Sequence, residues 1–456
     1  MTVSGSFRDP SGRVFAHEGG VLREVRQVYW EEYDRLMGSG LYEELVADGL
    51  LVAHQEIADY PAPSTDSYKV LKPVTIPFIS YPYEWSFSQL KDAALTTLEA
   101  ERIALGFGMS LKDASAFNVQ FLNGRPTIID TLSFQKYREG EPWTAYKQFC
   151  QHFLAPLAVM NYRGIWAGSM SLAHLDGVPL DLASSLLPLR SHIRPSIQIH
   201  LHLHARMIEK YSGKSNAGNK RKSTVSLHSR LGLIDNLKTT VEGLRWNRKP
   251  STWTGYYEGD SYTPDALGDK ARLTQQFLKQ VQPGSVWDLG ANTGRFSRLA
   301  SEMGIQTVAF DQDPAVVEGC YQTMRKQEDS NLLPLVMDLA NPSPPIGWAN
   351  RERLDLAQRG PVDMVLALAL IHHLAIANNV PFRMIAKYFK SITRWALVEF
   401  VPRTDPKAML LMETRQDSFE DYTQERFEDD FGALFRIEAT VPIAGSERLL
   451  YLLKSR

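Results

Sequence analysis

Short apolar runs alternate with longer segments of helical periodicity from residue 251 to residue 456. The apolar runs have the length of strands, and the intervening segments repeat their apolar residues every three to four positions. This alternation predicts an α/β fold with a mainly parallel sheet. The last two apolar runs, 435–443 and 447–455, are separated by Ala444, Gly445 and Ser446, which predicts a terminal hairpin.

The rest of the chain divides into two parts of different composition. Residues 1–190 mix helical and strand patterns, which predicts an α+β domain. Residues 190–250 contain thirteen lysines and arginines against three acidic residues, and their centre, 212–223, has the polar composition of a mobile loop. We therefore expect three parts: an α+β domain over 1–190, a basic connector with a mobile loop over 191–250, and an α/β domain over 251–456.

The overall composition is that of a folded soluble protein, with 44% hydrophobic and 22% charged residues. The formal net charge of −2 argues against a polycation built for nucleic acid, and the two cysteines form no C-x-x-C pair. The N-terminus has no apolar run, and the most apolar stretch, 153–175, is interrupted by polar side chains. We expect a cytoplasmic protein without a membrane span and without a metal site.

A glycine turn follows the first predicted strand of the α/β domain. Gly290 and Gly294 bracket this turn, and a helical pattern begins directly after it. A glycine at a strand end lets backbone approach a ligand closely, because no Cβ intervenes. Asn292 stands where a third glycine is common, and asparagine tolerates the positive φ that such a turn requires. The segment therefore predicts a ligand-binding turn.

The next predicted strands also end in side chains that can take part in chemistry. Asp311 closes the second strand, 21 residues after Gly290, at the distance where a carboxylate binds ribose hydroxyls. Ligands of open α/β sheets lie outside the carboxyl ends of the strands. We expect these residues to gather at one edge of the sheet: Asp288, Asp311, Asp338, His372 and Glu399.

The motifs DLGANTG, FDQD, MDL and LALALIHHL, in this order, resemble the class I S-adenosylmethionine-dependent methyltransferases over about residues 250–456. The resemblance implies a Rossmann-like, seven-stranded sheet with a reversed last strand, and S-adenosylmethionine (SAM) as cofactor. It places the methionine part of SAM at the turn, the ribose at Asp311 and adenine near Asp338, which would accept from the adenine amino group. The cofactor-binding residues that it implies are Asp288, Gly290, Ala291, Asn292, Gly294, Asp311, Gln312, Asp338 and Leu339.

A dinucleotide-binding Rossmann domain is the main alternative for this part of the chain. Such a domain uses G-x-G-x-x-G to place a pyrophosphate at a helix start. This chain has G-x-x-x-G, preceded by Asp288, and a carboxylate there suits the cationic amine of methionine better than a diphosphate. The pattern favours SAM.

Methyl transfer from a sulfonium depends mainly on alignment of the reacting groups, and a general base is required only for a protonated acceptor. His372 and His373 follow the fourth predicted strand and can accept a proton near neutral pH. Each could instead cap a helix or belong to the core. Glu399 is a further catalytic candidate, and its alternative is a solvated carboxylate at a strand end. The insertion 341–359 could shape the acceptor pocket, and Trp253, Tyr256, Tyr257 and Tyr262 could form a lid.

A second constellation lies in the N-terminal part. Asp113 is followed by Asn118 five residues later and by Asp130 after a hairpin predicted across Asn123 and Gly124. This spacing resembles the catalytic centre of the kinase-like fold, which implies a nucleotide or metal site at these three residues. The segment departs from that pattern at two places. Leu111 and Lys112, rather than His-Arg, precede Asp113, and Thr131 and Leu132, rather than Phe-Gly, follow Asp130. The same side chains could simply stabilise turns, and Arg23 is the candidate for a phosphate-binding cation.

The sequence thus predicts a SAM-dependent methyltransferase that acts on an oxygen or nitrogen acceptor. The acceptor itself is not identified; it could be anionic, and nucleic acid is not favoured. Two alternatives stay open. One is a bifunctional kinase–methyltransferase acting on a glycan or another small acceptor, and the other is a non-catalytic module that binds the cofactor.

Overall fold

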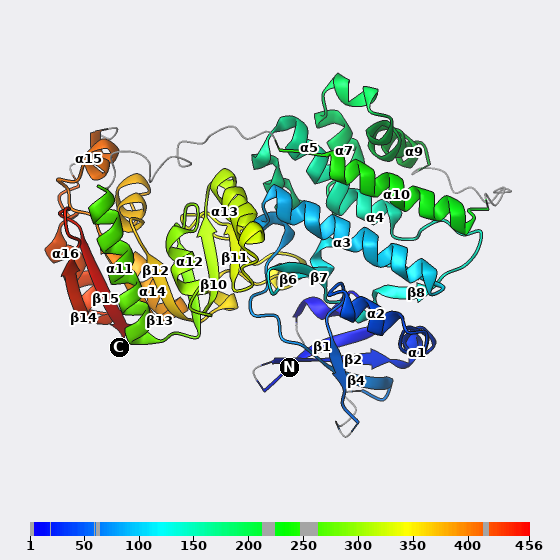
Figure 1. Ribbon diagram of the computed structural model, residues 1–456, viewed down its shortest axis with the longest axis horizontal. Coiled ribbons are helices and arrows are strands. Elements are labelled where there is room, and N and C mark those ends of the chain that lie inside the picture. The colour runs from blue at the N-terminus through cyan, green and yellow to red at the C-terminus, as the bar shows by residue number, and fades with distance from the viewer. Residues whose placement is uncertain are drawn as a thin grey trace. The chain divides into compact units, whose positions relative to one another are not determined.

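The computed structural model in Figure 1 describes residues 4–18, 20–58, 60, 64–211, 224–246, 263–413 and 419–456. Contacts within the chain define two compact units. Unit 1 comprises Met1–Asn247 together with Gly347–Arg353, and unit 2 comprises Arg248–Ile346 together with Leu354–Arg456. The predicted mixture of helices and strands is confirmed, and unit 2 has the alternating α/β order. The centre of the predicted basic connector and the four aromatic residues of the predicted lid lie outside the described residues.

Unit 1 begins with an antiparallel sheet in the order β1-β2-β4-β3. A tyrosine-rich cluster, to which Tyr29 and Tyr33 contribute, packs against β2 and β4. The strands and the two helices of this part are β1 (Gly12–His17), β2 (Gly20–Arg26), β3 (His54–Glu56), β4 (Ser67–Pro73), α1 (Trp30–Gly38) and α2 (Leu41–Ala47).

The remainder of unit 1 is mainly helical, with two short antiparallel pairs, β5 with β8 and β6 with β7. The predicted hairpin across Asn123 and Gly124 is confirmed, and both residues adopt positive φ. The elements are β5 (Met109–Leu111), β6 (Val119–Leu122), β7 (Arg125–Ile128), β8 (Phe134–Lys136), α3 (Phe87–Gly106), α4 (Tyr146–Phe149), α5 (Ala155–Arg163), α6 (Met170–Ala173), α7 (Leu180–Leu186), α8 (Pro195–Ile197), α9 (His204–Tyr211) and α10 (Leu227–Gly243).

The described part of the basic segment 191–250 packs within unit 1. Figure 1 shows α10 alongside α3. Lys91 of α3 donates to the carbonyl oxygens of Glu242 and Leu244 at 2.8 and 2.9 Å. Arg230 of α10 is buried and lies 3.3 Å from the Glu101 carboxylate of α3. These contacts make α10 an integral part of unit 1, although its sequence suggested a connector.

Unit 2 contains a seven-stranded sheet in the order β11-β10-β9-β12-β13-β15-β14. Neighbouring strands from β11 to β13 are parallel, and β15 is antiparallel to both β13 and β14. The predicted terminal hairpin is therefore confirmed. The strands are β9 (Ser285–Leu289), β10 (Gln306–Asp311), β11 (Leu332–Val336), β12 (Val362–Ala367), β13 (Thr393–Phe400), β14 (Phe435–Pro442) and β15 (Leu449–Ser455).

Helices pack on both faces of this sheet because successive strand residues point to opposite sides. On one face, apolar residues of α11 and α12 pack against Val286, Leu366 and Leu397. On the other face, Phe382 of α14 and Phe427 of α16 contact Phe400, with ring centroids 6.3 and 5.4 Å away. The helices are α11 (Pro264–Val281), α12 (Arg295–Ser301), α13 (Pro314–Gln327), α14 (Phe382–Ile392), α15 (Pro406–Glu413) and α16 (Gln424–Gly432).

None of the helices within the described ranges has both the length and the apolar composition that crossing a bilayer requires.

Candidate cofactor-binding site

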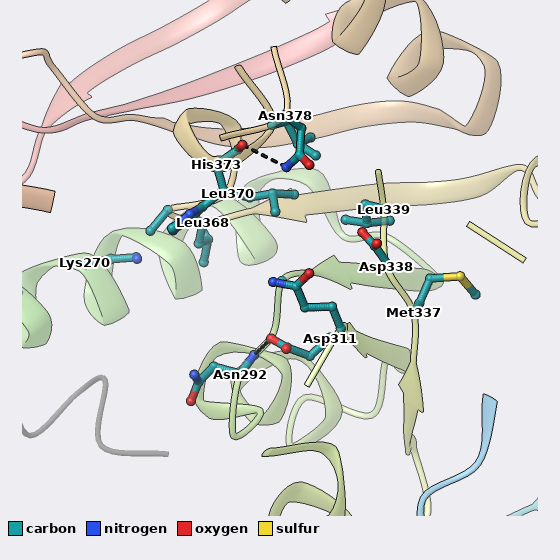
Figure 2. A pocket seen from close by; sticks show the side chains of 14 residues that line it. Lys270, Asn292, Asp311, Met337, Asp338, Leu339, Leu368, Leu370, His373 and Asn378 are labelled. Atoms are coloured by element: carbon teal, nitrogen blue, oxygen red, sulfur yellow. Dashed lines mark hydrogen bonds between the residues drawn. The ribbon is translucent and has the colours of Figure 1, made fainter. Parts of the chain in front are cut away.

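A cavity of about 750 Å³, including the space at its open mouth, lies at the carboxyl ends of β9, β10, β11 and β12 (Figure 2). The strand order reverses at β9, since β10 and β12 lie on its two sides, and ligands of open α/β sheets bind at such a point. Seven of the predicted site residues line the cavity: Gly290, Asn292, Asp311, Gln312, Asp338, Leu339 and His373. The structure thus brings these seven residues together at one edge of the sheet.

The glycine turn has positive φ angles at positions whose residue types allow them. Gly290 and Asn292 adopt φ values of +78° and +52°. A Cβ atom at position 290 would lie 3.1 Å from Cδ1 of Leu370, across the cavity wall. Glycine suits this position because its φ is positive and because a Cβ would contact Leu370 tightly, and Asn292 occupies the left-handed region as predicted.

The backbone amides of this turn are all engaged within the chain. Those of residues 290 and 291 donate to the carbonyl oxygen of Phe310, and that of residue 294 donates to Ala291. The amide of Asn292 donates to Asp311, and that of Thr293 donates to the side-chain oxygen of Asn292. No amide from residue 290 to residue 294 remains free to bind a phosphate, although such binding is the function of the turn in dinucleotide-binding domains.

Asp311 is the acidic side chain at the centre of the site. Its Oδ2 atom accepts from the amide of Asn292 at 2.8 Å, and its Oδ1 atom accepts from the amide of Asp313 at 2.9 Å. Burial raises the pKa of this carboxyl to about 6. Because an ionised carboxylate can accept about four hydrogen bonds, Asp311 retains acceptor capacity toward the cavity.

Lys270 is a lining residue that the sequence analysis missed. It lies on α11, is 1% exposed, and contacts Glu399 at 2.6 Å. Its ammonium group also lies 4.5 Å from the ring centroid of Phe296, and burial lowers its pKa. A signal for it exists in the sequence, because Lys270 falls within the stripe of α11 that otherwise buries Leu267, Leu273 and Thr274.

Glu399 lies in a buried ion-pair network rather than on the cavity wall. Its carboxylate contacts Lys270 and, at 3.2 Å, Arg448, which in turn contacts Asp405 at 2.7 Å. Glu399 has no exposed surface, so the alternative of a solvated strand-end carboxylate is wrong. Its position behind Lys270 follows from β13, where it points to the same face as Leu397.

The two predicted histidines occupy different environments. His373 lines the cavity, and burial lowers its pKa to about 4, so the ring is neutral at pH 7. His372 is completely buried and does not line the cavity; burial lowers its pKa even further. The ring centroids are 4.1 Å apart. Of the two, only His373 is in a position to contact a ligand in this cavity.

Three of the predicted cofactor-binding residues are packed within the turn or behind it. Asp288 is buried, accepts from the Ser297 hydroxyl at 2.6 Å, and has a pKa raised to about 6 by burial. A Cβ at Gly294 would lie 2.4 Å from Sγ of Cys320, so this glycine allows α12 and α13 to pack closely. Ala291 is also buried. None of the three is among the residues that line the cavity.

The far end of the cavity combines an exposed acid with apolar side chains. Asp338 follows β11, and its Oδ1 atom accepts from the amide of Ala340 at 2.9 Å. Leu339 and Met337 line the cavity beside it. In the view of Figure 2, Asp311 lies between Lys270 on one side and Met337 on the other.

The N-terminal constellation is brought together within unit 1. Burial, and then the nearby Asp130, raise the pKa of Asp113, whose carboxylate also accepts from Asn118. Arg23 of β2 forms an ion pair with Asp130. Both acids also stabilise turns, since Asp113 accepts from the amide of Ser115 and Asp130 accepts from that of Leu132.

Comparison with known proteins finds one relative that matches along nearly all of this chain, and solved structures that match less than half of it. No protein-family model matches the chain. The magnesium protoporphyrin IX methyltransferase ChlM of Synechocystis PCC 6803, solved with SAM bound, matches at 18% identity over 44% of this chain and 90% of its own, with a TM-score of 0.31. The bifunctional kinase-methyltransferase WbdD matches at 14% identity over 44% of this chain and 42% of its own, also with a TM-score of 0.31. Because these structural matches cover less than half of the chain, they carry no functional argument. The proposed function rests on the residues of the cavity instead.

The nodulation protein NoeA of Rhizobium meliloti (strain 1021) is 35% identical over 458 residues, covering 98% of this chain and 95% of its own. Because the match spans both units at this identity, the chain belongs to the family of nodulation protein NoeA.

Proposed function

We propose that unit 2 is a SAM-dependent methyltransferase domain that transfers a methyl group to an oxygen or nitrogen acceptor. The observation that carries this proposal is the position of Asp311, a half-buried residue whose carboxylate lines the cavity between the glycine turn and Asp338. Partial removal from water raises the pKa of this carboxyl, and further hydrogen-bond donors stabilise its ionised form; a ribose diol supplies two such donors.

The other lining residues match the remaining parts of such a cofactor. Asp338 can accept from the adenine amino group, and Leu339 and Met337 offer apolar surface to the adenine ring. The Lys270 ammonium group lies where it can attract a carboxylate at the opposite end. SAM, when bound, supplies an electrophilic methyl group, and the walls of the cavity orient the acceptor toward it.

His373 is the residue of the chain that we assign to proton transfer. Its neutral ring can accept a proton from a hydroxyl or an amine as the acceptor attacks. Glu399 would act indirectly, by holding Lys270 at the cavity wall. A labelled-methyl assay on cell extract separates this enzyme from a non-catalytic module, because such a module binds SAM and labels no acceptor.

Dinucleotide binding is disfavoured by the hydrogen bonds of the turn. The amides of residues 290–294 are all donated within the chain, so a pyrophosphate would have to break existing bonds. An uncharged ribose and an adenine ring require no such donors from the turn. This difference supports SAM over a nicotinamide or flavin dinucleotide.

Replacing Asp311 by asparagine should weaken binding of S-adenosylhomocysteine roughly tenfold to a hundredfold, because a hydrogen bond to a charged group contributes about 1.5–3 kcal/mol. Isothermal titration calorimetry on the full chain measures this change. Asp363→Asn is the matched control, since Asp363 also accepts from two backbone amides, those of Gly284 and Ser285, but does not line the cavity. Equal affinity in the two variants would remove Asp311 from the ribose site.

Affinity for S-adenosylhomocysteine should fall as pH drops below about 6. The pKa of Asp311 is raised to about 6 in the free protein, and ligand hydroxyls favour the ionised form, so binding releases a proton at acidic pH. Above pH 6 the carboxylate is already ionised and affinity should be flat. Calorimetric titrations from pH 5 to pH 8 test this, and Asp311→Asn should lose most of the slope. A slope that is unchanged in this variant would assign the proton to another group.

A second candidate function, nucleotide binding by a kinase-like unit 1, is supported by the proximity of Asp113, Asn118 and Asp130. The four-stranded sheet with Arg23 on β2, followed by a helical part, is also the order of a kinase-like fold. Among the described residues, however, no three acidic, histidine or cysteine side chains are grouped as a metal site.

If these residues bind a nucleotide, ATP with magnesium should raise the melting temperature of the full chain, and the increase should disappear in Asp130→Asn. Asp34→Asn serves as the control, because Asp34 is an exposed acid of the same unit that accepts a hydrogen bond from the Tyr68 hydroxyl. If ATP with magnesium leaves the melting temperature of the unaltered chain unchanged, unit 1 is a scaffold.

A further inference from the structure

Large apolar side chains are exposed together on residues 189–207 of unit 1. Their exposed fractions are far above those of core residues: Leu189 87%, Ile193 81%, Ile199 52%, Leu203 41% and Met207 60%. Exposed apolar residues that occur singly are ordinary, whereas a contiguous group marks an interaction site.

Three of these residues form a stripe along one helical segment. The π-helical turn Gln198–Leu203 continues into α9, and Ile199, Leu203 and Met207 follow at intervals of four. The opposite side of the same segment is buried, where His200 bonds to the Tyr146 hydroxyl and to Asn236, both at 2.7 Å. The segment is thus firmly packed on its inner side and apolar on its outer side.

The other two exposed residues lie on a neighbouring element, the 3₁₀ helix Leu189–Ile193. The ring of His192 stacks on that of His202 with centroids 3.7 Å apart, and it bonds to Gln198 at 2.7 Å. Ser191 also bonds to the ring of His202 at 2.8 Å. These contacts hold the 3₁₀ helix against the π-helical turn, so that both elements contribute to one surface.

Basic side chains accompany the apolar ones. Arg190 and Arg194 are exposed beside Leu189 and Ile193, with their guanidinium groups 5.6 and 5.7 Å from the ring centroid of Tyr162. On α9, Arg206 and Lys210 are exposed on the same side as Met207. From residue 189 to residue 210, Glu209 is the single acidic residue.

We propose that this basic–apolar face, formed by Leu189–Arg194 and by the outer side of 198–210, docks on an anionic lipid bilayer. Apolar residues inserted beside lysine and arginine are the combination by which helical segments lie in a membrane interface. The apolar side chains enter the acyl boundary, and the four cations meet lipid phosphates. A second copy fits poorly, because a twofold contact would set this positive face against itself.

Sedimentation of the full chain with vesicles tests the proposal. Binding should be strong to phosphatidylcholine vesicles that contain phosphatidylglycerol and weak to phosphatidylcholine alone, and salt should reduce it by screening. Leu203→Ser combined with Met207→Ser should lower the partition coefficient about tenfold or more, since apolar burial is lost. Met384→Ser combined with Met409→Ser, which alters exposed methionines of unit 2, is the control and should leave binding unchanged.

Arg206→Gln combined with Lys210→Gln should lower the partition coefficient about 25-fold at low salt, because each basic residue near an anionic surface contributes about 1 kcal/mol. The exposed positions of all these residues leave the fold intact, and circular dichroism verifies it. Equal binding to both vesicle types would overturn the proposal. So would a stable dimer that Leu203→Ser with Met207→Ser dissociates, since the face would then contact protein.

Discussion

Replacing Glu399 by alanine should lower the free energy of unfolding by about 3–5 kcal/mol, because it removes the carboxylate that pairs with the buried Lys270 ammonium and one of the two that pair with Arg448. Lys270 and Arg448 are both about 1% exposed, and the Glu399 carboxylate lies between them at 2.6 and 3.2 Å. Denaturant unfolding followed by circular dichroism measures the loss. Cofactor binding should decline as well, since Lys270 is part of the cavity wall.

Glu438→Ala is the matched control for this prediction. Glu438 also pairs with an arginine, Arg436, but the pair is at the surface of β14. Surface pairs contribute about 0–1 kcal/mol, so this variant should unfold almost like the unaltered chain. The two variants could instead have the same stability, with methyl transfer abolished in Glu399→Ala and retained in Glu438→Ala. That result would make Glu399 a catalytic group and would contradict its structural role.

Replacing Gly290 by valine should reduce affinity for S-adenosylhomocysteine by more than about a hundredfold. A Cβ at this position would lie 3.1 Å from Leu370, and the two further methyl groups of valine have to enter the cavity. The positive φ of +78° adds backbone strain of about 1–3 kcal/mol. Titration calorimetry measures the loss of affinity, and a thermal melt measures the strain.

Gly304→Val separates these two effects. Gly304 has a φ of +80°, and a Cβ there would have no atom within 4 Å. This variant carries the same backbone strain without filling the cavity, so it should lose stability and keep its affinity. A comparable loss of affinity in both variants would show that strain, rather than occlusion of the cavity, weakens binding.

The edge of the sheet that holds the site could be predicted because its signals are local. The apolar runs, the glycine turn and Asp311 lie within a few residues of the structural features that they specify. Parallel strands then bring their carboxyl ends together without further information. The positive φ of Asn292 could be predicted for the same reason.

The roles of Lys270 and Glu399 depend on packing between distant segments. Glu399 is the last but one residue of β13 and Asp311 is the last residue of β10, so the sequence pattern treats the two acids alike. Their environments differ because α11 and the residue before β15 supply cations to Glu399, whereas Asp311 accepts hydrogen bonds from backbone amides. Periodicity does not specify which charged side chains pack together.

The insertion 341–359 illustrates the same difficulty. The sequence suggested that it shapes an acceptor pocket, yet Gly347–Arg353 belongs to unit 1. There Glu352 forms two hydrogen bonds with the guanidinium group of Arg8, at 2.8 and 3.0 Å, across 344 positions of the sequence. No pattern of neighbouring residues in the sequence indicates that Arg8 and Glu352 form these hydrogen bonds.

Calorimetric titration of the full chain with S-adenosylhomocysteine is the most direct test of the cofactor site. We predict saturable binding at one site per chain, which Gly290→Val removes and Gly304→Val preserves. Absence of saturable heat with this ligand, or saturable binding of a nicotinamide dinucleotide in its place, would contradict the assignment of the cavity to SAM.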